Sequence, residues 1–222
     1  MTDLAARKEF AEPRLGQEVV KRTLDIALAS VLVVVTSPLL LLLLFLVRST
    51  SAGPALFRQE RIGRGMRTFV MMKLRTMYDG NDDRVHRAYI TSMLSAEKET
   101  PAQNGALFKL VGDPRVTPLG AWLRRTSLDE LPQLINVLRG DMSLVGPRPM
   151  LPWEARLLAG QYRPRFTVKP GITGLWQVSG RSRLSMRTAL ELDVEYARRR
   201  SVLLDLTILA RTLPALFRGG AS

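Results

Sequence analysis

The feature that limits the fold most is an uncharged, apolar run from Ile26 to Val47. Its length is close to the roughly 20 residues that an α-helix needs to cross the hydrocarbon core of a bilayer. The run is too long, and lies too far from the first residue, for a cleaved signal peptide, and it has no clear small-residue cleavage site. The sequence therefore predicts a helix in the membrane, which either spans the bilayer or enters and leaves on one side.

Ser37-Pro38 lies in the middle of this run, and basic residues lie on both sides of it. Proline removes one helical hydrogen bond and favours a kink, while the serine hydroxyl can bond the carbonyl that is left free. Basic flanks favour the cytoplasmic side, and a spanning helix would put either Lys21-Arg22 or the arginines of residues 48–67 on the wrong side. We therefore expect a re-entrant helix over residues 21–49 that breaks at Ser37-Pro38. A kinked spanning helix is the alternative.

The net charge of +13 is carried largely by arginine. Such a surplus indicates an anionic partner, which can be nucleic acid, anionic lipid or a phosphorylated substrate. The chain has no cysteine and one histidine, His86, which excludes a disulfide framework and thiolate or histidine-rich metal sites. Any chemistry therefore has to use carboxylates, arginines, lysines or hydroxyls.

The stretch 123–133 combines two arginines, two hydroxyls, two adjacent carboxylates and a proline. Ser127 and Glu130 have the spacing of a capping box, and apolar residues at helical spacing follow. This places Asp129 in a first helical turn, where backbone N–H groups attract anions. Pro132 suits a first turn but not a helix interior, so the helix can begin one residue later. Taken alone, acids that only cap the helix are the simpler explanation.

Local patterns predict the remaining elements. Residues 55–77 have two strand-like segments around Gly63-Arg64-Gly65, which predicts a β-hairpin. Gly63-x-Gly65 is a turn rather than a nucleotide loop, because it lacks a third glycine and does not open a helix. The segment 202–217 suits a helix on the membrane surface or one facing the core equally well. The other expected elements are a surface helix over 85–98 with an exposed His86, helices over 119–125, 153–161 and 184–200, a turn over 169–174 and a strand over 176–178.

Arg148 lies between two prolines, Pro147 and Pro149, on a stiff and extended backbone. An arginine held in this way is suited to binding a phosphate in a fixed geometry. A linker is the commoner explanation of Pro-Arg-Pro when it is considered alone.

Taken together, these motifs resemble the bacterial sugar transferase family, whose members are also called monotopic phosphoglycosyl transferases. The resemblance begins at Lys21-Arg22-Thr23-Leu24-Asp25 and runs almost to the C-terminus. We expect a chain that is similar to a compact catalytic form of the family, without extra N-terminal spanning helices. The matching motifs are Ser37-Pro38, Lys73-Leu74-Arg75-Thr76-Met77, the stretch from Arg125 to Gln133, the stretch from Gly140 to Pro149, and Lys169-Pro170-Gly171-Ile172-Thr173-Gly174.

The resemblance implies an α/β fold that is mostly helical, with a small hairpin or sheet and amphipathic helices at the membrane interface. It implies three parts: an arm over 1–20, the re-entrant helix over 21–49, and a catalytic domain over 50–222 on the cytoplasmic face of the bacterial inner membrane. The implied reaction moves a sugar phosphate from a UDP-sugar to a polyprenyl phosphate of the undecaprenyl type and releases UMP. This would be the initiating step of exopolysaccharide, O-antigen, capsule or glycoprotein glycan assembly.

The resemblance also assigns roles to residues of the site. Asp129 would attack the β-phosphate and carry the phosphosugar, and a carboxylate needs no base for this at neutral pH. Glu130 would bind Mg²⁺, which prefers oxygen ligands and neutralises a diphosphate. Asp193 is a second acid expected near the metal, and Asp141 is a competing nucleophile by residue type. The residues expected to hold phosphates are Lys73, Arg124 and Arg148.

Two other classes of protein remain as alternatives. A membrane-tethered nucleic-acid-binding protein would also be basic, but here the cations are scattered among Gly-Pro turns and no recognised binding motif occurs. A non-catalytic interaction module is the other, and the intact Asp129-Glu130 pair argues against it. The expected partners are therefore a UDP-sugar, a polyprenyl phosphate and membrane lipid, with no nucleic acid. The sequence does not indicate which sugar is used or the oligomeric state.

Overall fold

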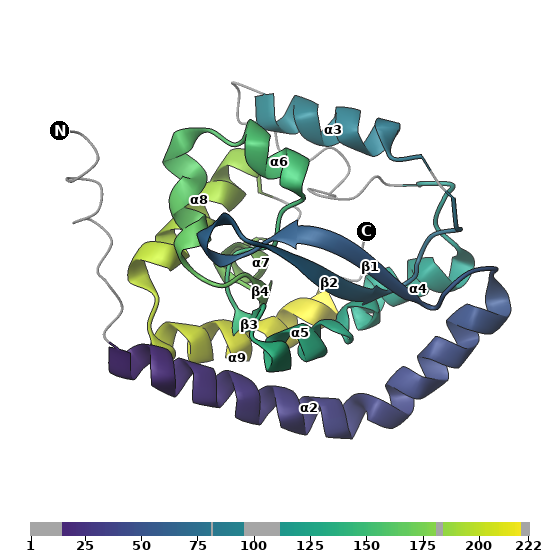
Figure 1. The fold of residues 1–222 in the computed structure, drawn as a ribbon, viewed down its shortest axis with the longest axis horizontal. Helices are drawn as coiled ribbons and strands as arrows, with labels where there is room; N and C mark the ends of the chain where they lie inside the picture. The colour runs from purple at the N-terminus through teal and green to yellow at the C-terminus, as the bar shows by residue number, and fades with distance from the viewer. Residues whose placement is uncertain (1–14, 81, 96–111, 181–183, 219–222) are drawn as a thin grey trace.

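A computed structural model describes residues 15–80, 82–95, 112–180 and 184–218 (Figure 1). The described chain is mostly helical and has two small sheets, in agreement with the predicted fold class. Its elements in order are α2 (Leu15–Thr50), β1 (Leu56–Ile62), the 3₁₀ turn η1 (Arg64–Met66), β2 (Thr68–Leu74), α3 (Arg84–Ser95), α4 (Pro118–Thr126), the 3₁₀ turn η3 (Leu128–Glu130), α5 (Gln133–Arg139), β3 (Ser143–Val145), α6 (Pro152–Leu157), the 3₁₀ helix η4 (Gly160–Thr167), β4 (Gly171–Thr173), α7 (Leu175–Ser179), α8 (Met186–Arg199) and α9 (Val202–Arg218).

Helix α2 runs along one side of the molecule and bends in its second half toward α4 (Figure 1). Pro38 lies inside the helix, which continues from Leu15 to Thr50. The hydroxyl of Ser37 donates to the Val34 carbonyl at 2.8 Å. This is the carbonyl that residue 38 would bond in a regular helix, so Ser37 replaces the hydrogen bond that proline cannot make. The expected break at Ser37-Pro38 therefore takes the form of a bend in a continuous helix, not of an end to it.

The outer face of α2 is apolar. Val34 and Phe45, for example, are 71% and 68% exposed. By length and composition α2 is the one helix among the described residues that could cross a membrane, with a mean hydropathy of 2.8 over its most apolar window. The part of the predicted arm within residues 1–14 lies outside the described residues, and residues 15–20 belong to α2.

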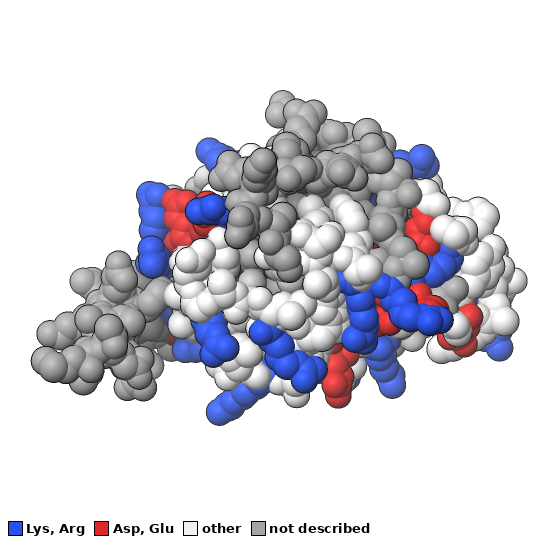
Figure 2. Space-filling model, turned by 90° about the horizontal axis from the view of Figure 1, so that it is seen from above, with Lys and Arg blue, Asp and Glu red and all other residues white. Residues whose placement is uncertain are grey.

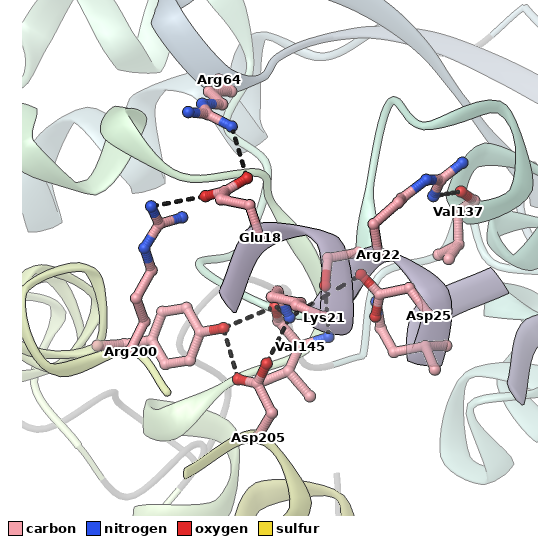
Figure 3. A network of polar contacts seen from close by, with 12 residues as sticks. Glu18, Lys21, Arg22, Asp25, Arg64, Val137, Val145, Arg200 and Asp205 are labelled. Carbon is pink, nitrogen blue, oxygen red and sulfur yellow. Dashed lines mark hydrogen bonds and ion pairs between the residues drawn. The ribbon is translucent and has the colours of Figure 1, made fainter. Parts of the chain in front are cut away.

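Partly buried polar contacts join the N-terminal part of α2 to the rest of the protein (Figure 3). The Lys21 ammonium donates to Asp205 of α9 at 2.5 Å, and the Arg22 guanidinium donates to the Val137 carbonyl at 2.6 Å, near the end of α5. Asp25 accepts the backbone N–H of Leu144 in β3 at 3.1 Å. Three charged residues on one helical turn therefore bind three different elements.

Arg75 ties the C-terminal end of α2 in the same way. This buried residue follows β2 and donates to the carbonyls of Val47 and Ser51, at 3.2 and 2.8 Å. It therefore satisfies carbonyls that a helix end leaves without intrahelical partners. Both ends of α2 consequently contact the same globular body.

Strands β1 and β2 form the predicted hairpin, and Gly65 in its turn has φ = 66°. The free edge of β2 is closed by a side chain rather than by a third strand. Buried Asn136 of α5 accepts from the Met72 N–H at 3.0 Å and donates to the Val70 carbonyl at 2.7 Å. This amide fixes α5, and with it the preceding turn η3, against β2.

Strands β3 and β4 pair in parallel, with Ser143 opposite Gly171 and Val145 opposite Thr173. The segment 169–174 was expected to be only a turn, and β4 within it is a correction. The expected strand over 176–178 is also wrong, because these residues lie in helix α7. A segment of three residues is too short for its pattern to distinguish a strand from a helix, and the helix buries Trp176.

Gly171→Ala is expected to destabilise the protein by about 2 to 3 kcal/mol or more. A Cβ atom at this position would lie 2.1 Å from the backbone nitrogen of Gly146, and neither backbone can give way without separating β3 from β4. Thermal unfolding of the purified protein would measure the effect. The control is Gly160→Ala, whose added Cβ meets nothing within 4 Å, and an equal melting temperature for the two variants would contradict the prediction.

Three of the C-terminal and central helices agree with their predicted positions, namely α4, α8 and α9. Helix α9 combines the two orientations left open by the sequence. Ile208 is buried in the core, whereas Leu203 on another face is 75% exposed. Helix α6 ends at Leu157, before the predicted boundary at 161, and η4 follows it.

Helix α3 forms within the predicted surface segment over 85–98, of which residues 96–98 lie outside the described part. His86 is half-buried rather than exposed, which corrects the prediction, and this burial lowers its pKa.

Candidate active site

A small cleft opens where the hairpin, the acidic turn η3, the Pro147–Pro149 segment and the β4–α7 segment meet. Of the residues expected at a catalytic or binding site, the structure brings Lys73, Glu130 and Arg148 together in this cleft. The sequence analysis missed three further polar residues that line it: Arg61, Gln133 and Gln177.

Lys73 and Glu130 form the central ion pair of the cleft. The Lys73 ammonium lies 3.1 Å from a carboxylate oxygen of Glu130, and both side chains are partly exposed. Asp129 immediately precedes Glu130 in η3 and is 5% exposed. The adjacent carboxylates therefore differ in environment, since Asp129 is buried and Glu130 faces the cleft.

The expected capping box over Ser127 and Glu130 does not form. Ser127 adopts a left-handed conformation, with φ = 58°, because it ends α4, and its side chain makes no capping hydrogen bond. The Glu130 carboxylate pairs with Lys73 of the neighbouring strand instead. Asp129 therefore lies in a 3₁₀ turn ahead of α5, which starts only at Gln133 after Pro132.

Arg124 approaches Asp129 from α4. Its Nε donates to the Thr76 hydroxyl at 2.8 Å, across the end of β2. Burial lowers the pKa of Arg124, and the negative charge of Asp129 opposes this shift. Arg124 does not line the cleft with Arg148 and Lys73, so the structure places it on the Asp129 side.

A buried ion pair lies next to the backbone of Arg148 and fixes its position. Arg165 of η4 and Asp193 of α8 contact each other at 2.5 Å, and both are buried. Arg165 donates to the Arg148 carbonyl at 2.8 Å. Burial raises the pKa of Asp193, while Arg165 opposes the shift. These contacts fix the segment from which the Arg148 side chain reaches the cleft.

On the face shown in Figure 2, the described basic side chains do not form one continuous surface. Figure 2 shows Lys and Arg in separate groups on the visible face, with uncharged surface between them. This arrangement agrees with the scattered positions of the cations in the sequence.

Comparison with known proteins identifies the family. The sequence model of the family described as "Bacterial sugar transferase" matches residues 16–219. The chain belongs to the bacterial sugar transferase family.

Of three relatives of this sugar transferase, two carry names that state an activity. The chain is 41% identical to exopolysaccharide production protein ExoY of Sinorhizobium fredii over 88% of its own length and 84% of the relative. It is 40% identical to the UDP-glucose:undecaprenyl-phosphate glucose-1-phosphate transferase of Caulobacter vibrioides, covering 92% of the chain and 72% of the relative. It is 37% identical to the undecaprenyl-phosphate galactose phosphotransferase of Salmonella typhimurium, covering 89% of the chain but only 40% of the relative.

Among the described residues of this sugar transferase, the acids form no cluster of metal ligands. Within the described residues, no group of three or more His, Cys, Asp or Glu could hold a metal ion. Asp193, expected near a metal, lies behind Arg148 and pairs with Arg165 rather than lining the cleft with Glu130. Asp141 accepts from the Asn136 amide at 3.3 Å in the turn after α5, and it also lies outside the cleft lining.

Arg61 is the site residue of this sugar transferase that the sequence analysis overlooked most clearly. It lies in β1, is 8% exposed and lines the cleft beside Arg148. Its burial depends on Glu154 of α6 and on Pro149, which come from distant parts of the chain. A basic residue in a half-exposed hairpin gives no local signal of such burial, so the burial of Arg61 becomes visible only in the folded structure.

Proposed function

We propose that this sugar transferase moves a sugar phosphate from a UDP-sugar to a polyprenyl phosphate of the undecaprenyl type. The products are a polyprenyl-diphosphate sugar and UMP, in the initiating step of exopolysaccharide, O-antigen, capsule or glycoprotein glycan assembly. One observation carries the proposal: buried Asp129 adjoins Glu130 at a cleft that is also lined by Lys73 and Arg148. Two relatives named for undecaprenyl-phosphate transfer support it.

The proposed chemistry has two steps. A carboxylate oxygen of Asp129 attacks the β-phosphorus of the UDP-sugar, the bond from that phosphorus to the bridging oxygen breaks, and UMP leaves. The polyprenyl phosphate then attacks the aspartyl phosphosugar and frees the carboxylate. Lys73 and Arg148 bind phosphate oxygens at the cleft, and Arg124 stabilises charge on the Asp129 side.

Mg²⁺ is the proposed cofactor. The cation usually takes only one or two carboxylates from a protein and completes its shell with water and substrate phosphates. The Glu130 carboxylate at the cleft fits this requirement, and the contacts of Asp193 with Arg165 make it a positioning residue for Arg148 rather than a ligand. When bound, the ion would neutralise charge on the diphosphate.

A panel of nucleotide sugars tests the function directly. The purified full chain is mixed with Mg²⁺, a short polyprenyl phosphate and each sugar nucleotide in turn, and UMP is measured. We expect UMP with at least one UDP-sugar. Nucleic-acid binding without UMP release would favour a tethered nucleic-acid-binding protein, and neither activity would favour an interaction module.

We propose further that α2 is re-entrant and that the protein lies on the cytoplasmic face of the bacterial inner membrane. Both ends of α2 bind the same globular body, at Lys21–Asp25 and at Val47–Ser51. The part of α2 after Pro38 is about 18 Å long at 1.5 Å per residue, which is shorter than a hydrocarbon core of about 30 Å. A helix whose two ends must meet one body on one side cannot place them on opposite sides of a bilayer.

Cysteine labelling tests this topology, and the natural chain supplies no competing thiol. Gly16→Cys precedes the apolar run and Arg58→Cys follows it, and both positions are exposed. We expect an impermeant maleimide to label neither variant in intact cells and both after lysis. Labelling of one position from the periplasm would show a spanning helix. Pro38→Ala should straighten α2 and shift the population toward that labelled form.

A further inference from the structure

Arg61 carries a buried positive charge that the residues around it compensate poorly. Its guanidinium donates to the Pro149 carbonyl at 3.2 Å and to the Gln59 side chain at 2.6 Å. The nearest carboxylate oxygen, on Glu154, is 3.9 Å away and already accepts the Leu151 N–H at 2.8 Å. The Nε of Arg61 is buried and has no hydrogen-bond partner among the described residues.

A second arginine increases this imbalance. Arg148 lines the same cleft, and its charge acts together with burial to lower the pKa of Arg61 to about 10. A buried cation without a close counter-ion is costly, and two neighbouring cations are more so. A bound anion would remove this cost, because guanidinium groups match phosphate geometry.

We propose that Arg61 binds the diphosphate of the nucleotide-sugar donor as a second guanidinium beside Arg148. This inference rests on the proposed function and adds a residue to its donor site. The unpartnered Nε and the shared cleft carry the assignment.

The position of β1 favours the soluble donor over the lipid acceptor. Helix α2 packs against β2, whereas β1 packs against α6 and lies on the side of the hairpin away from α2 (Figure 1). A lipid phosphate that arrives along α2 reaches the Lys73 side of the cleft first. A water-soluble diphosphate has access from the β1 side, where Arg61 lies.

Kinetics of the full-length enzyme in lipid nanodiscs test the proposal. Arg61→Gln is expected to raise the KM for the UDP-sugar about 10- to 100-fold, as expected for loss of a hydrogen bond to a charged group, with the KM for polyprenyl phosphate unchanged within about twofold. Arg61→Lys keeps the charge but not the planar fork and should give an intermediate increase. Arg58→Gln, on the same strand but exposed, is the matched control and should behave as wild type.

Several outcomes would overturn the inference. One is an unchanged KM for the UDP-sugar in Arg61→Lys, which overturns the inference even if Arg61→Gln fails to fold. A larger effect on the polyprenyl phosphate KM would assign Arg61 to the acceptor, and a loss of melting temperature with both KM values unchanged would make it structural. If the wild type releases no UMP, the proposed function fails. The affinity for UDP, measured by calorimetry, then tests the role of Arg61 separately. Equal UDP affinity in wild type and Arg61→Lys would contradict the proposal.

Discussion

Asp129→Asn is expected to reduce UMP formation by about 10⁴-fold or more, which is the scale of losses seen when an enzyme loses its nucleophile. The amide has nearly the shape of the carboxylate but lacks its nucleophilic oxygen, so we expect the fold and membrane association to persist. Mass spectrometry of wild-type protein with UDP-sugar and Mg²⁺ alone should show a phosphosugar adduct on Asp129. The variant should show none.

Asp141→Asn is the matched control for this experiment. Asp141 is the other carboxylate considered as a nucleophile, and its contact with Asn136 belongs to the turn after α5. Its replacement should leave turnover within a fewfold of wild type. An adduct that maps to Asp141, or UMP release that strictly requires polyprenyl phosphate, would refute the covalent role of Asp129.

Glu130→Gln is expected to lower turnover about 100-fold and to raise the Mg²⁺ concentration needed for half-maximal activity. The change removes the charged oxygen that Mg²⁺ prefers and also the partner of Lys73, 3.1 Å away. Titration of activity with Mg²⁺ after treatment with EDTA would measure both effects.

Glu191→Gln provides the control for this second prediction. Glu191 is an exposed residue of α8 that pairs with Arg187 at 3.0 Å, and it does not line the cleft. We expect its Mg²⁺ titration to match that of wild type. Full turnover of the wild-type enzyme in excess EDTA would end the metal proposal.

Local elements of the fold were predictable because their signals are local. The hairpin follows from two strand-like segments around Gly63-Arg64-Gly65, and α8 and α9 follow from apolar residues at helical spacing. Strand β4 was not predictable in this way, since three residues acquire strand geometry only through pairing with β3 from residue 143 onward.

The candidate site also has a part that local motifs predict and a part that depends on contacts between distant segments. The motifs drew attention to Lys73, Glu130 and Arg148, which line the cleft together. The capping box at Ser127 failed because the end of α4 and the ion pair with Lys73 outweigh a local preference. Asp193 was expected near a metal as a second acid. Its ion pair with Arg165 could not be predicted, because Arg165, between Pro164 and Phe166, carries no sequence signal of burial.

The contact between Lys21 and Asp205 sets a condition on how the protein is made. The two residues are 184 positions apart, and ribosomes add roughly 5 to 20 residues per second. Helix α2 therefore leaves the ribosome about 10 to 40 seconds before its charged partner on α9 exists. Throughout this interval its basic turn has no α9 to bind, so the helix made last completes the attachment of the helix made first.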